Sequence, residues 1–356
     1  MPPPATVRFT IEFRDITACP ADVVVLKHAR KFYGADRIVK ESLTETGVPE
    51  DLMRPADGAH SLIQTRGGIR APLALYLGTA RLGAFQYALI REFVSESLTI
   101  LSRESPDARH VAMTLHGVGA GLDETECALS QLKGLVQAIK ANRIPRGLER
   151  FTICEYNRKR ALRIQERVAQ YLKHANFAQT GSGEWGFDLA RQDTSRREWA
   201  ARIQKAGSVP AAARETAAFP ESQDADEKPY AFVAMPFREE LDDIFFYGIQ
   251  EPVHRSGLLC ERVDQSAFTG DVLEHIRTRI ENAKVVIAEL SDASPNVYLE
   301  VGYAWGRGVP TILLTQSGEA LKFDVRNQRC LVYKRIKDLE VILARELEAL
   351  RESGRI

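Results

Sequence analysis

The residue whose position suggests chemistry most directly is Glu300, in a Glu-Val-Gly-Tyr-Ala segment. It follows an apolar, β-branched run, Lys284–Leu290, and a turn-forming segment, Ser291–Pro295, which together predict a buried strand that ends in a loop. Helical side chains lean toward the N-terminus of their helix, so a glutamate one turn inside the next helix would point back at that loop. A carboxylate there would face the carboxyl edge of the sheet, where open α/β sheets bind ligands. A salt bridge is the alternative role, and spacing alone favours it.

The residues around Glu300 predict a parallel sheet. Asn296 is suited to cap a helix that buries Val297, Val301 and Ala304, and Pro310–Thr315 is the next apolar run. Strand, helix and strand in this order form a right-handed unit with parallel strands. Further strands are predicted at Tyr230–Met235, Leu258–Val263 and Cys330–Tyr333, with helices at Leu241–Arg255, Asp271–Ala283 and Ile336–Arg351. The fold class expected for this region is therefore α/β, with a flavodoxin-like, doubly wound parallel sheet of about five strands.

Loops at the carboxyl edge of such a sheet bind ligands. The candidate nucleotide- or sugar-binding residues in these loops are Met235, Pro236, Phe237, Asp264, Thr269, Gly270, Ser291, Ser294 and Asn296. Phe237 is suited to cover a base or a nicotinamide ring, or to pack on the helix that follows. Thr269 fits a helix N-cap better than a phosphate contact, and Asp264 fits hydrogen bonds to sugar hydroxyls.

Four motifs resemble the nucleoside 2-deoxyribosyltransferase-like branch of the N-(deoxy)ribosyltransferase superfamily, whose relatives include TIR-like NAD-cleaving domains of bacterial antiphage systems. The motifs are FVAMPF, GDVLEHIRTRIENAKVVIAEL, PNVYLEVGYAWGRG and FDVRNQR. The resemblance implies that Glu300 attacks or stabilises the anomeric carbon, with NAD as a substrate and no separate cofactor. Deoxyribosyltransferases carry an additional Asp where this chain has Ser294, and Glu289 stands where relatives often have Asp. These departures favour cleavage of NAD or another nucleotide, because nicotinamide leaves without needing a proton.

The N-terminal half predicts a second α/β domain. Its strands are expected at Val7–Phe13, Ala21–Leu26, Leu73–Leu77, Val111–Leu115 and Phe151–Glu155, and its helices at Phe85–Leu101, Glu124–Ala141 and Asn157–Lys173. Between a strand and a helix, Gly117, Gly119 and Gly121 form a loop whose backbone N–H groups can approach a phosphate. Ordinary turn chemistry is the commoner reason for such glycines.

Two segments of this half, FRDITACPADVVVLKHA and VAMTLHGVGAGLDETECALSQLKGLVQAI, resemble macro domains and the macro-like N-terminal domain of leucine aminopeptidases. The resemblance implies a mixed sheet, an ADP-ribose-type ligand and a contact between Asp15 and adenine. Arg14 replaces an expected Gly, and Lys27 and His28 stand where an Asn-containing segment is expected. A scaffold for assembly, or for sensing another ligand, is the alternative.

The sequence divides into a macro-like domain at residues 1–178, a linker at 179–228 and the nucleoside 2-deoxyribosyltransferase-like domain at 229–356. The linker is expected to hold a short helix around Ser195–Gln204. Its aromatic residues Trp185, Phe187 and Trp199 are expected to pack on a domain or on a neighbouring subunit, and a homo-oligomer is expected.

Composition argues against several classes of protein. The 48 basic and 48 acidic residues give a formal net charge of zero, which does not favour a nucleic-acid or membrane-surface partner. The N-terminus lacks the apolar core of a signal peptide, and no apolar run of about 18 residues is present. The five cysteines are dispersed, so reduced thiols in a cytoplasmic protein are expected. No metal-ligand spacing is recognisable.

Together these patterns favour a regulated N-glycosidase that cleaves NAD or a related nucleotide. Its expected small-molecule partner is NAD, ADP-ribose or a cyclic nucleotide signal. By analogy, such a protein resembles a prokaryotic antiphage effector whose macro-like domain senses a ligand or drives assembly. A nucleoside 2-deoxyribosyltransferase-like enzyme and a non-catalytic nucleotide-binding sensor are the alternatives.

Overall fold

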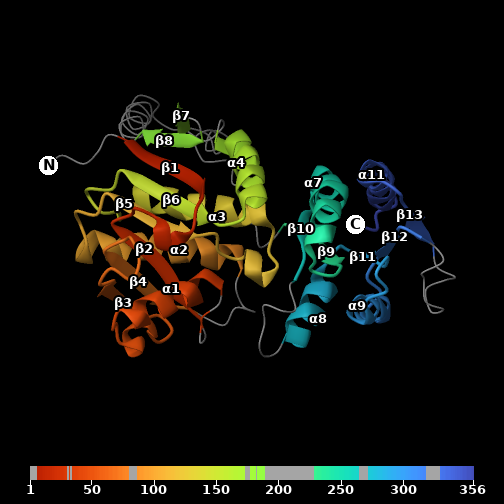
Figure 1. Ribbon diagram of the computed structural model, residues 1–356. Coiled ribbons are helices and arrows are strands. Elements are labelled where there is room, and N and C mark those ends of the chain that lie inside the picture. Colours follow the sequence, from red (N-terminus) through yellow and green to blue (C-terminus); the bar gives the residue numbers. More distant parts are fainter. Residues whose placement is uncertain are drawn as a thin grey trace, which may run out of the picture. The chain divides into compact units, whose positions relative to one another are not determined.

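The computed structural model describes residues 6–29, 32, 34–79, 86–172, 177–181, 183–188, 228–263, 272–317 and 329–356. The chain forms two compact units (Figure 1). The first contains Met1–His116 and Glu124–Ala225, and the second contains Gly117–Asp123 and Asp226–Ile356. The glycine-bearing segment that the sequence assigns to the N-terminal domain therefore belongs to the second unit.

The first unit is built on a mixed sheet of eight strands in the order β3-β4-β2-β5-β6-β1-β8-β7. Its strands are β1 (Thr6–Phe13), β2 (Val23–His28), β3 (His60–Gln64), β4 (Leu73–Gly78), β5 (His110–Thr114), β6 (Arg150–Glu155), β7 (Phe177–Gly181) and β8 (Glu184–Asp188). Strands β1, β2, β4, β5 and β6 are parallel, and β3 and the β7–β8 hairpin join them in antiparallel pairings. This confirms the predicted mixed α/β sheet.

Both faces of this sheet are covered. Its helices are α1 (Gly34–Glu45), α2 (Tyr87–Glu104), α3 (Glu124–Lys140) and α4 (Arg158–Leu172). Val23 and Val25 of β2 pack in one hydrophobic core with residues of α2, α3 and α4, whereas Val24 and Leu26 pack in another with residues of α1. Alternate side chains of a strand point to opposite faces, so a strand buried on both faces is apolar throughout.

The β7–β8 hairpin extends the first unit's sheet beyond residue 178, the predicted end of the domain. Trp185 and Phe187, which the sequence places in a linker, lie in β8 and are buried in the core of this unit. The Phe187 ring packs on Phe177, with the ring centroids 4.9 Å apart. The predicted helix around Ser195–Gln204, including Trp199, lies outside the described residues.

The second unit confirms the predicted doubly wound sheet. Its five parallel strands are ordered β10-β9-β11-β12-β13. They are β9 (Tyr230–Ala234), β10 (Leu259–Glu261), β11 (Val285–Glu289), β12 (Thr311–Thr315) and β13 (Cys330–Val332). The order is that of flavodoxin-like folds, and its direction reverses between β9 and β11, the place where such sheets bind ligands.

Helices cover both faces of the second sheet as well (Figure 1). They are α6 (Glu239–Asp243), a π-helical segment (Ile244–Gln250), α7 (Glu251–Arg255), α8 (Val272–Asn282), α9 (Pro295–Gly306) and α11 (Ile336–Glu352). The predicted single helix Leu241–Arg255 thus has a π-helical centre next to Pro252, which lacks the N–H group of an α-helical hydrogen bond. A Cβ atom on Gly248 would lie 2.6 Å from Leu339, so this glycine lets α11 pack closely.

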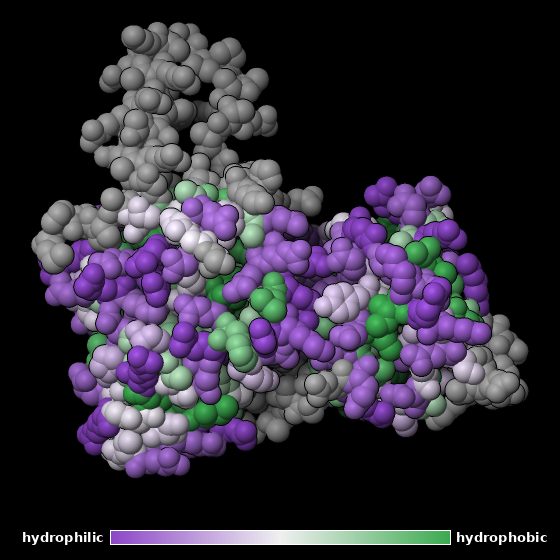
Figure 2. Space-filling model, turned by 45° about the horizontal axis from the view of Figure 1, so that its top comes forward, coloured by the Kyte–Doolittle hydropathy of each residue, from purple (hydrophilic) through white to green (hydrophobic). Residues whose placement is uncertain are grey.

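One face of the molecule is mostly polar. Figure 2 shows hydrophilic residues over most of the visible face, interrupted by small hydrophobic patches. Four of the five cysteines are buried, and Cys330 is partly exposed. No helix in the described ranges has the length and apolar content needed to cross a bilayer.

Candidate functional site

Two loops flank the reversal point of the second unit's sheet. Met235–Phe237 follows β9 and Ser291–Ser294 follows β11, and these two strands pair directly. An ion pair of 3.0 Å between Arg238 Nη1 and Asp292 Oδ2 joins the loops. The fold therefore brings together the predicted site residues of the first and third loops. Asp264, Thr269 and Gly270, predicted in the second loop, lie outside the described residues.

Glu300 lies on the buried side of α9. It is only 8% exposed, and it shares this side with Val297, Val301 and Ala304, the core positions that the sequence predicts. The helix contacts β9, β11 and β12, so Glu300 is carried on its sheet-facing side. Glutamate is rarely buried this deeply in proteins unless its carboxylate is paired.

The prediction that Asn296 caps α9 is wrong. The residue at the N-cap is Ser294, whose side chain makes no capping hydrogen bond, and the helix begins at Pro295. A proline suits the first helical position because its φ angle is already helical and it has no N–H group to satisfy. Asn296 therefore lies inside the first turn, next to the loop.

A second buried carboxyl group lies at the same sheet edge. Glu289 ends β11 and is 1% exposed. It accepts hydrogen bonds from the Ser291 hydroxyl and from the Tyr333 hydroxyl, the latter at 3.1 Å. The Ser291 hydroxyl in turn accepts a hydrogen bond of 2.8 Å from the N–H of Gln316. Burial raises the pKa of Glu289, while the hydrogen bonds from Ser291 and Tyr333 oppose that rise.

Phe237 is 40% exposed at this edge and stacks on a buried arginine. The Cζ atom of Arg262 lies 4.1 Å from the centre of the Phe237 ring. Sequence reasoning missed Arg262 and Tyr333. Both lie at the carboxyl end of a predicted strand, and in the structure both directly follow the observed strand. Position at the carboxyl end of a predicted strand is therefore the signal that points to them.

The Asp15 turn of the first unit carries a different group of exposed residues. Asp15 caps the 3-10 helix Ile16–Ala18, and its carboxylate accepts hydrogen bonds from the N–H of Thr17 at 2.9 Å and from the Thr17 hydroxyl at 2.8 Å. Phe13 is 57% exposed and Tyr156 is 75% exposed. Phe13 ends β1 and is the register partner of Glu155, next to Tyr156, so both aromatic side chains belong to one sheet edge. Neither was predicted.

A buried polar cluster occupies the neighbouring part of that edge. Lys27 Nζ lies 2.9 Å from Asp36 Oδ2 and 3.2 Å from His116 Nδ1. Burial, together with the Lys27 charge, holds the pKa of His116 well below its usual value. The ring is therefore neutral with its proton on Nε2, and this atom has no hydrogen-bond partner among the described residues. Lys27, which stands where a macro-like Asn is expected, is thus committed to Asp36.

The three predicted loop glycines differ in their surroundings. Gly117 and Gly121 have φ angles of 96° and 85°, which favour glycine. A Cβ atom on Gly121 would lie 2.7 Å from Val263, whereas one on Gly119 would meet nothing within 4 Å. Gly121 therefore has a packing reason to be glycine, and Gly119 has none in the described contacts.

A cavity of about 260 Å³ lies in the first unit between β1, α4 and the β7–β8 hairpin. Its lining includes Phe9, Ile11, Leu162, Gln165 and Trp185, and none of the predicted site residues. Within the described ranges, no three His, Cys, Asp or Glu side chains cluster as metal ligands.

No protein-family model matches this chain, and no curated protein matches it. Solved structures do match its N-terminal unit. The Trypanosoma brucei macrodomain in complex with ADP-ribose is 12% identical, over 45% of this chain and 68% of that one, with a TM-score of 0.37. The Oceanobacillus iheyensis macrodomain with MES bound is 12% identical, over 48% of this chain and 98% of that one, with a TM-score of 0.35. At this level of similarity, neither protein's ligand transfers to this chain.

Proposed function

We propose that the second unit is an N-glycosidase that cleaves NAD or a related nucleotide. The observation that carries the proposal is the burial of Glu300 on the sheet-facing side of α9, beside the reversal point of a doubly wound sheet. Ligands bind at this point in open α/β sheets. The loops Met235–Phe237 and Ser291–Ser294 would hold the nucleotide there, with Phe237 against a ring.

One carboxylate suffices for the chemistry on NAD. The bond between the sugar's anomeric carbon and the nicotinamide nitrogen breaks, and its electron pair goes to the ring, which leaves neutral. The sugar becomes an oxocarbenium-like cation that Glu300 stabilises or captures. Water then adds to the anomeric carbon and releases a proton, so that ADP-ribose and nicotinamide are the products.

Deoxyribosyl transfer between bases is the second candidate, and Glu289 favours it. An ordinary base needs a proton as it leaves, and a carboxyl group can supply one when its pKa is raised toward neutrality. Burial raises the pKa of Glu289 at the same sheet edge. Glu289 would be the acid partner that the Ser294 position does not provide.

The first unit would act as the sensor. Phe13 and Tyr156 offer exposed aromatic surface near Asp15, which suits a nucleotide base. ADP-ribose or a cyclic nucleotide signal is the proposed ligand. A sensor joined to a nucleotide-cleaving unit is the arrangement of a regulated effector, and we propose a cytoplasmic, homo-oligomeric antiphage protein as its setting.

The test is nicotinamide release by the full-length chain. Wild type, Glu300→Gln and Glu274→Gln, a control at an exposed position of α8, are incubated with NAD, with and without ADP-ribose or cyclic nucleotides. We expect Glu300→Gln to lose at least about 100-fold in rate and the control to lose nothing. Full activity in Glu300→Gln would refute the role of Glu300.

A parallel reaction with mixed deoxynucleosides separates the two candidates. Glu289→Gln should abolish base exchange if Glu289 is the proton donor, and it should leave NAD cleavage largely intact. If the wild type neither cleaves NAD under any of these conditions nor exchanges bases, the enzymatic proposal fails and nucleotide binding alone is left.

A further inference from the structure

Arg262 is a buried charge at the candidate site of the second unit. It directly follows β10 and is 9% exposed. Its Cζ atom lies 4.1 Å from the centre of the Phe237 ring and 4.1 Å from the centre of the Phe245 ring. Arginine over an aromatic ring is attracted by the ring's electrons, and more strongly when water is excluded. Arg262 thus links an exposed ring, Phe237, to a buried one, Phe245.

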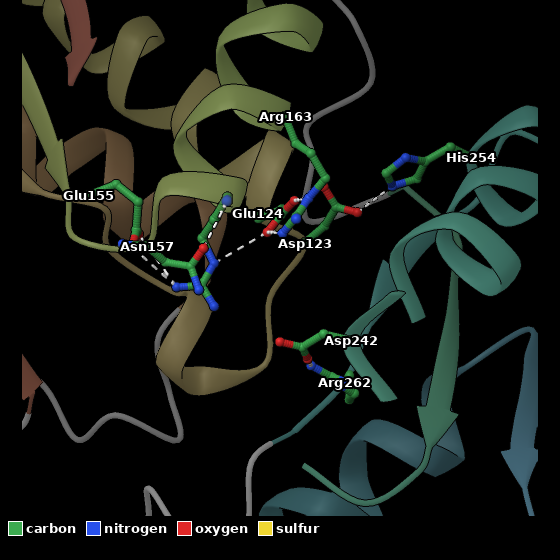
Figure 3. A network of polar contacts seen from close by, with 9 residues as sticks. Asp123, Glu124, Glu155, Asn157, Arg163, Asp242, His254 and Arg262 are labelled. Carbon is green, nitrogen blue, oxygen red and sulfur yellow. Dashed lines mark hydrogen bonds and ion pairs between the residues drawn. The ribbon is translucent and has the colours of Figure 1, made fainter. Parts of the chain in front are cut away.

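The direction of the Arg262 side chain is fixed by an acidic partner. Its Nη2 atom lies 3.2 Å from Asp242 Oδ1, in α6 (Figure 3). A planar guanidinium held by a carboxylate and two rings has little rotational freedom. The loop residue Phe237 therefore rests on a rigid support.

The backbone of Arg262 is held by the segment Gly117–Asp123, which belongs to the same unit. Its N–H group donates a hydrogen bond of 3.1 Å to the carbonyl of Gly121. Two residues further along this segment, the Asp123 carboxylate accepts a hydrogen bond of 3.2 Å from the N–H of Cys260. It also accepts one of 2.5 Å from His254 Nε2, which Figure 3 shows. Asp123 is 1% exposed, so the segment is anchored along β10 by buried contacts.

Gly121 is the tightest point of this contact. A Cβ atom there would lie 2.7 Å from Cγ2 and 2.8 Å from Cα of Val263, and 3.1 Å from the Arg262 carbonyl. A larger residue would therefore displace the end of β10 itself. Gly119, two residues earlier, offers a matched position with nothing within 4 Å.

We propose that Arg262 is a positioning residue that holds Phe237 in place for the nucleotide ring, and that Gly121 sets the position of Arg262. The inference rests on the proposed function of the second unit, in which Phe237 covers a base or a nicotinamide ring. It gives the glycine segment a role in the second unit's site that is separate from phosphate binding.

The first test reads the Phe237 ring directly and does not depend on catalysis. 4-Fluorophenylalanine is placed at position 237 of the full-length protein, and its fluorine resonance is recorded in otherwise wild-type protein, Arg262→Met, Arg262→Lys, Gly121→Ala and Gly119→Ala. We expect the resonance to move in Arg262→Met and Gly121→Ala, to move less in Arg262→Lys, and to stay in place in Gly119→Ala.

The second test separates KM from kcat for NAD. Because Phe237 would contact the ring in both the bound and the reacting state, Arg262→Met should raise KM about tenfold and change kcat less than about threefold. A fall in kcat at constant KM would overturn the positioning role.

The outcomes distinguish the two proposals. An unchanged fluorine resonance in Arg262→Met overturns the positioning role, whatever the protein does to NAD. A resonance that moves as expected, in a protein that cleaves no nucleotide, supports the positioning role and removes the proposed enzymatic function. If Gly121→Ala does not fold, the Met and Lys variants of Arg262 still decide whether Arg262 holds Phe237 in place.

Discussion

The hydroxyl of Tyr333 donates a hydrogen bond of 3.1 Å to Oε1 of Glu289, and so joins the ends of β13 and β11, two strands separated in the sheet by β12. Ser291 links the intervening strand β12 to this contact, because its hydroxyl donates to Glu289 and accepts from the N–H of Gln316, which follows β12. Three strand ends are thus tied together by side chains around one buried carboxyl group.

Tyr333→Phe should lower the free energy of unfolding of the second unit and make that free energy depend more strongly on pH. The change removes a donor to a buried carboxylate, which costs about 1–3 kcal/mol. The pKa of Glu289 is already raised in the folded protein, so the folded state binds more protons than the unfolded state between the ordinary and the raised pKa. Stability therefore falls as pH rises through that window, and losing the Tyr333 bond should deepen the fall because that bond lowers the pKa.

Urea unfolding of wild type and Tyr333→Phe between pH 4.5 and 8 measures this effect. Tyr247→Phe, at a position 51% exposed, is the control. A constant difference between wild type and Tyr333→Phe across the whole range would contradict the role of Glu289.

His116 should make the first unit sensitive to acid. Its folded pKa is depressed, so at pH values below about 6.5 the unfolded state takes up a proton that the folded state does not. Stability should fall by about 1.4 kcal/mol per pH unit below that point for this one group. Burial also lowers the pKa of His110, which adds to the slope. His116→Gln should remove this contribution of about 1.4 kcal/mol per pH unit from the slope. Equal slopes in wild type and His116→Gln would show that His116 is protonated in the folded state.

Phe13→Ala and Tyr156→Ala should weaken ligand binding to the first unit without changing its stability. Both side chains are more than half exposed, and stacking of a base on an aromatic ring is worth about 1–3 kcal/mol. Calorimetric titration with ADP-ribose measures the change in Kd. Leu162→Ala, at a position 56% exposed on α4, is the control. Identical Kd values in all four proteins would place any ligand elsewhere.

Gly302→Ala should stabilise the second unit by about 0.5–1 kcal/mol, because alanine loses less backbone entropy in a helix. A Cβ atom on Gly302 would meet nothing within 4 Å. Gly134→Ala is the matched contrast in another helix, because its Cβ atom would lie 2.5 Å from the Arg91 carbonyl and should destabilise the first unit. Thermal unfolding distinguishes the two. If Gly302→Ala is more stable yet loses NAD cleavage, the substrate needs the space that the missing side chain of Gly302 leaves open.

The strands of the second unit were predictable because they are buried on both faces. β11 lies inside the predicted Lys284–Leu290 run, and all five of its residues are buried. By contrast, β3 has a single buried residue, Ile63, and no continuous apolar run marks it. The glycine-containing strand β8 and the end of β7 fall in the predicted linker, 179–228, for the same reason.

The candidate site was predictable only where it depends on local spacing. Val297, Val301 and Ala304 define the buried side of α9, and Glu300 falls between them. Arg262 could not be identified in this way, because its partners Phe237 and Phe245 come from other segments. His116 directly precedes the glycine-bearing segment, but its neutral state depends on burial and on the charge of Lys27, 89 positions away.

The strand order of the first unit has a consequence for synthesis on the ribosome. β1 lies between β6 and β8, and the hydroxyls of Thr10 and Thr152 meet across 142 positions of sequence. At 5–20 residues per second, translation needs roughly 7–28 seconds to deliver the partner strand. During that interval β1, whose Val7, Phe9 and Ile11 are buried in the folded core, has neither neighbour. A chaperone that shields nascent chains should therefore improve the yield of this protein.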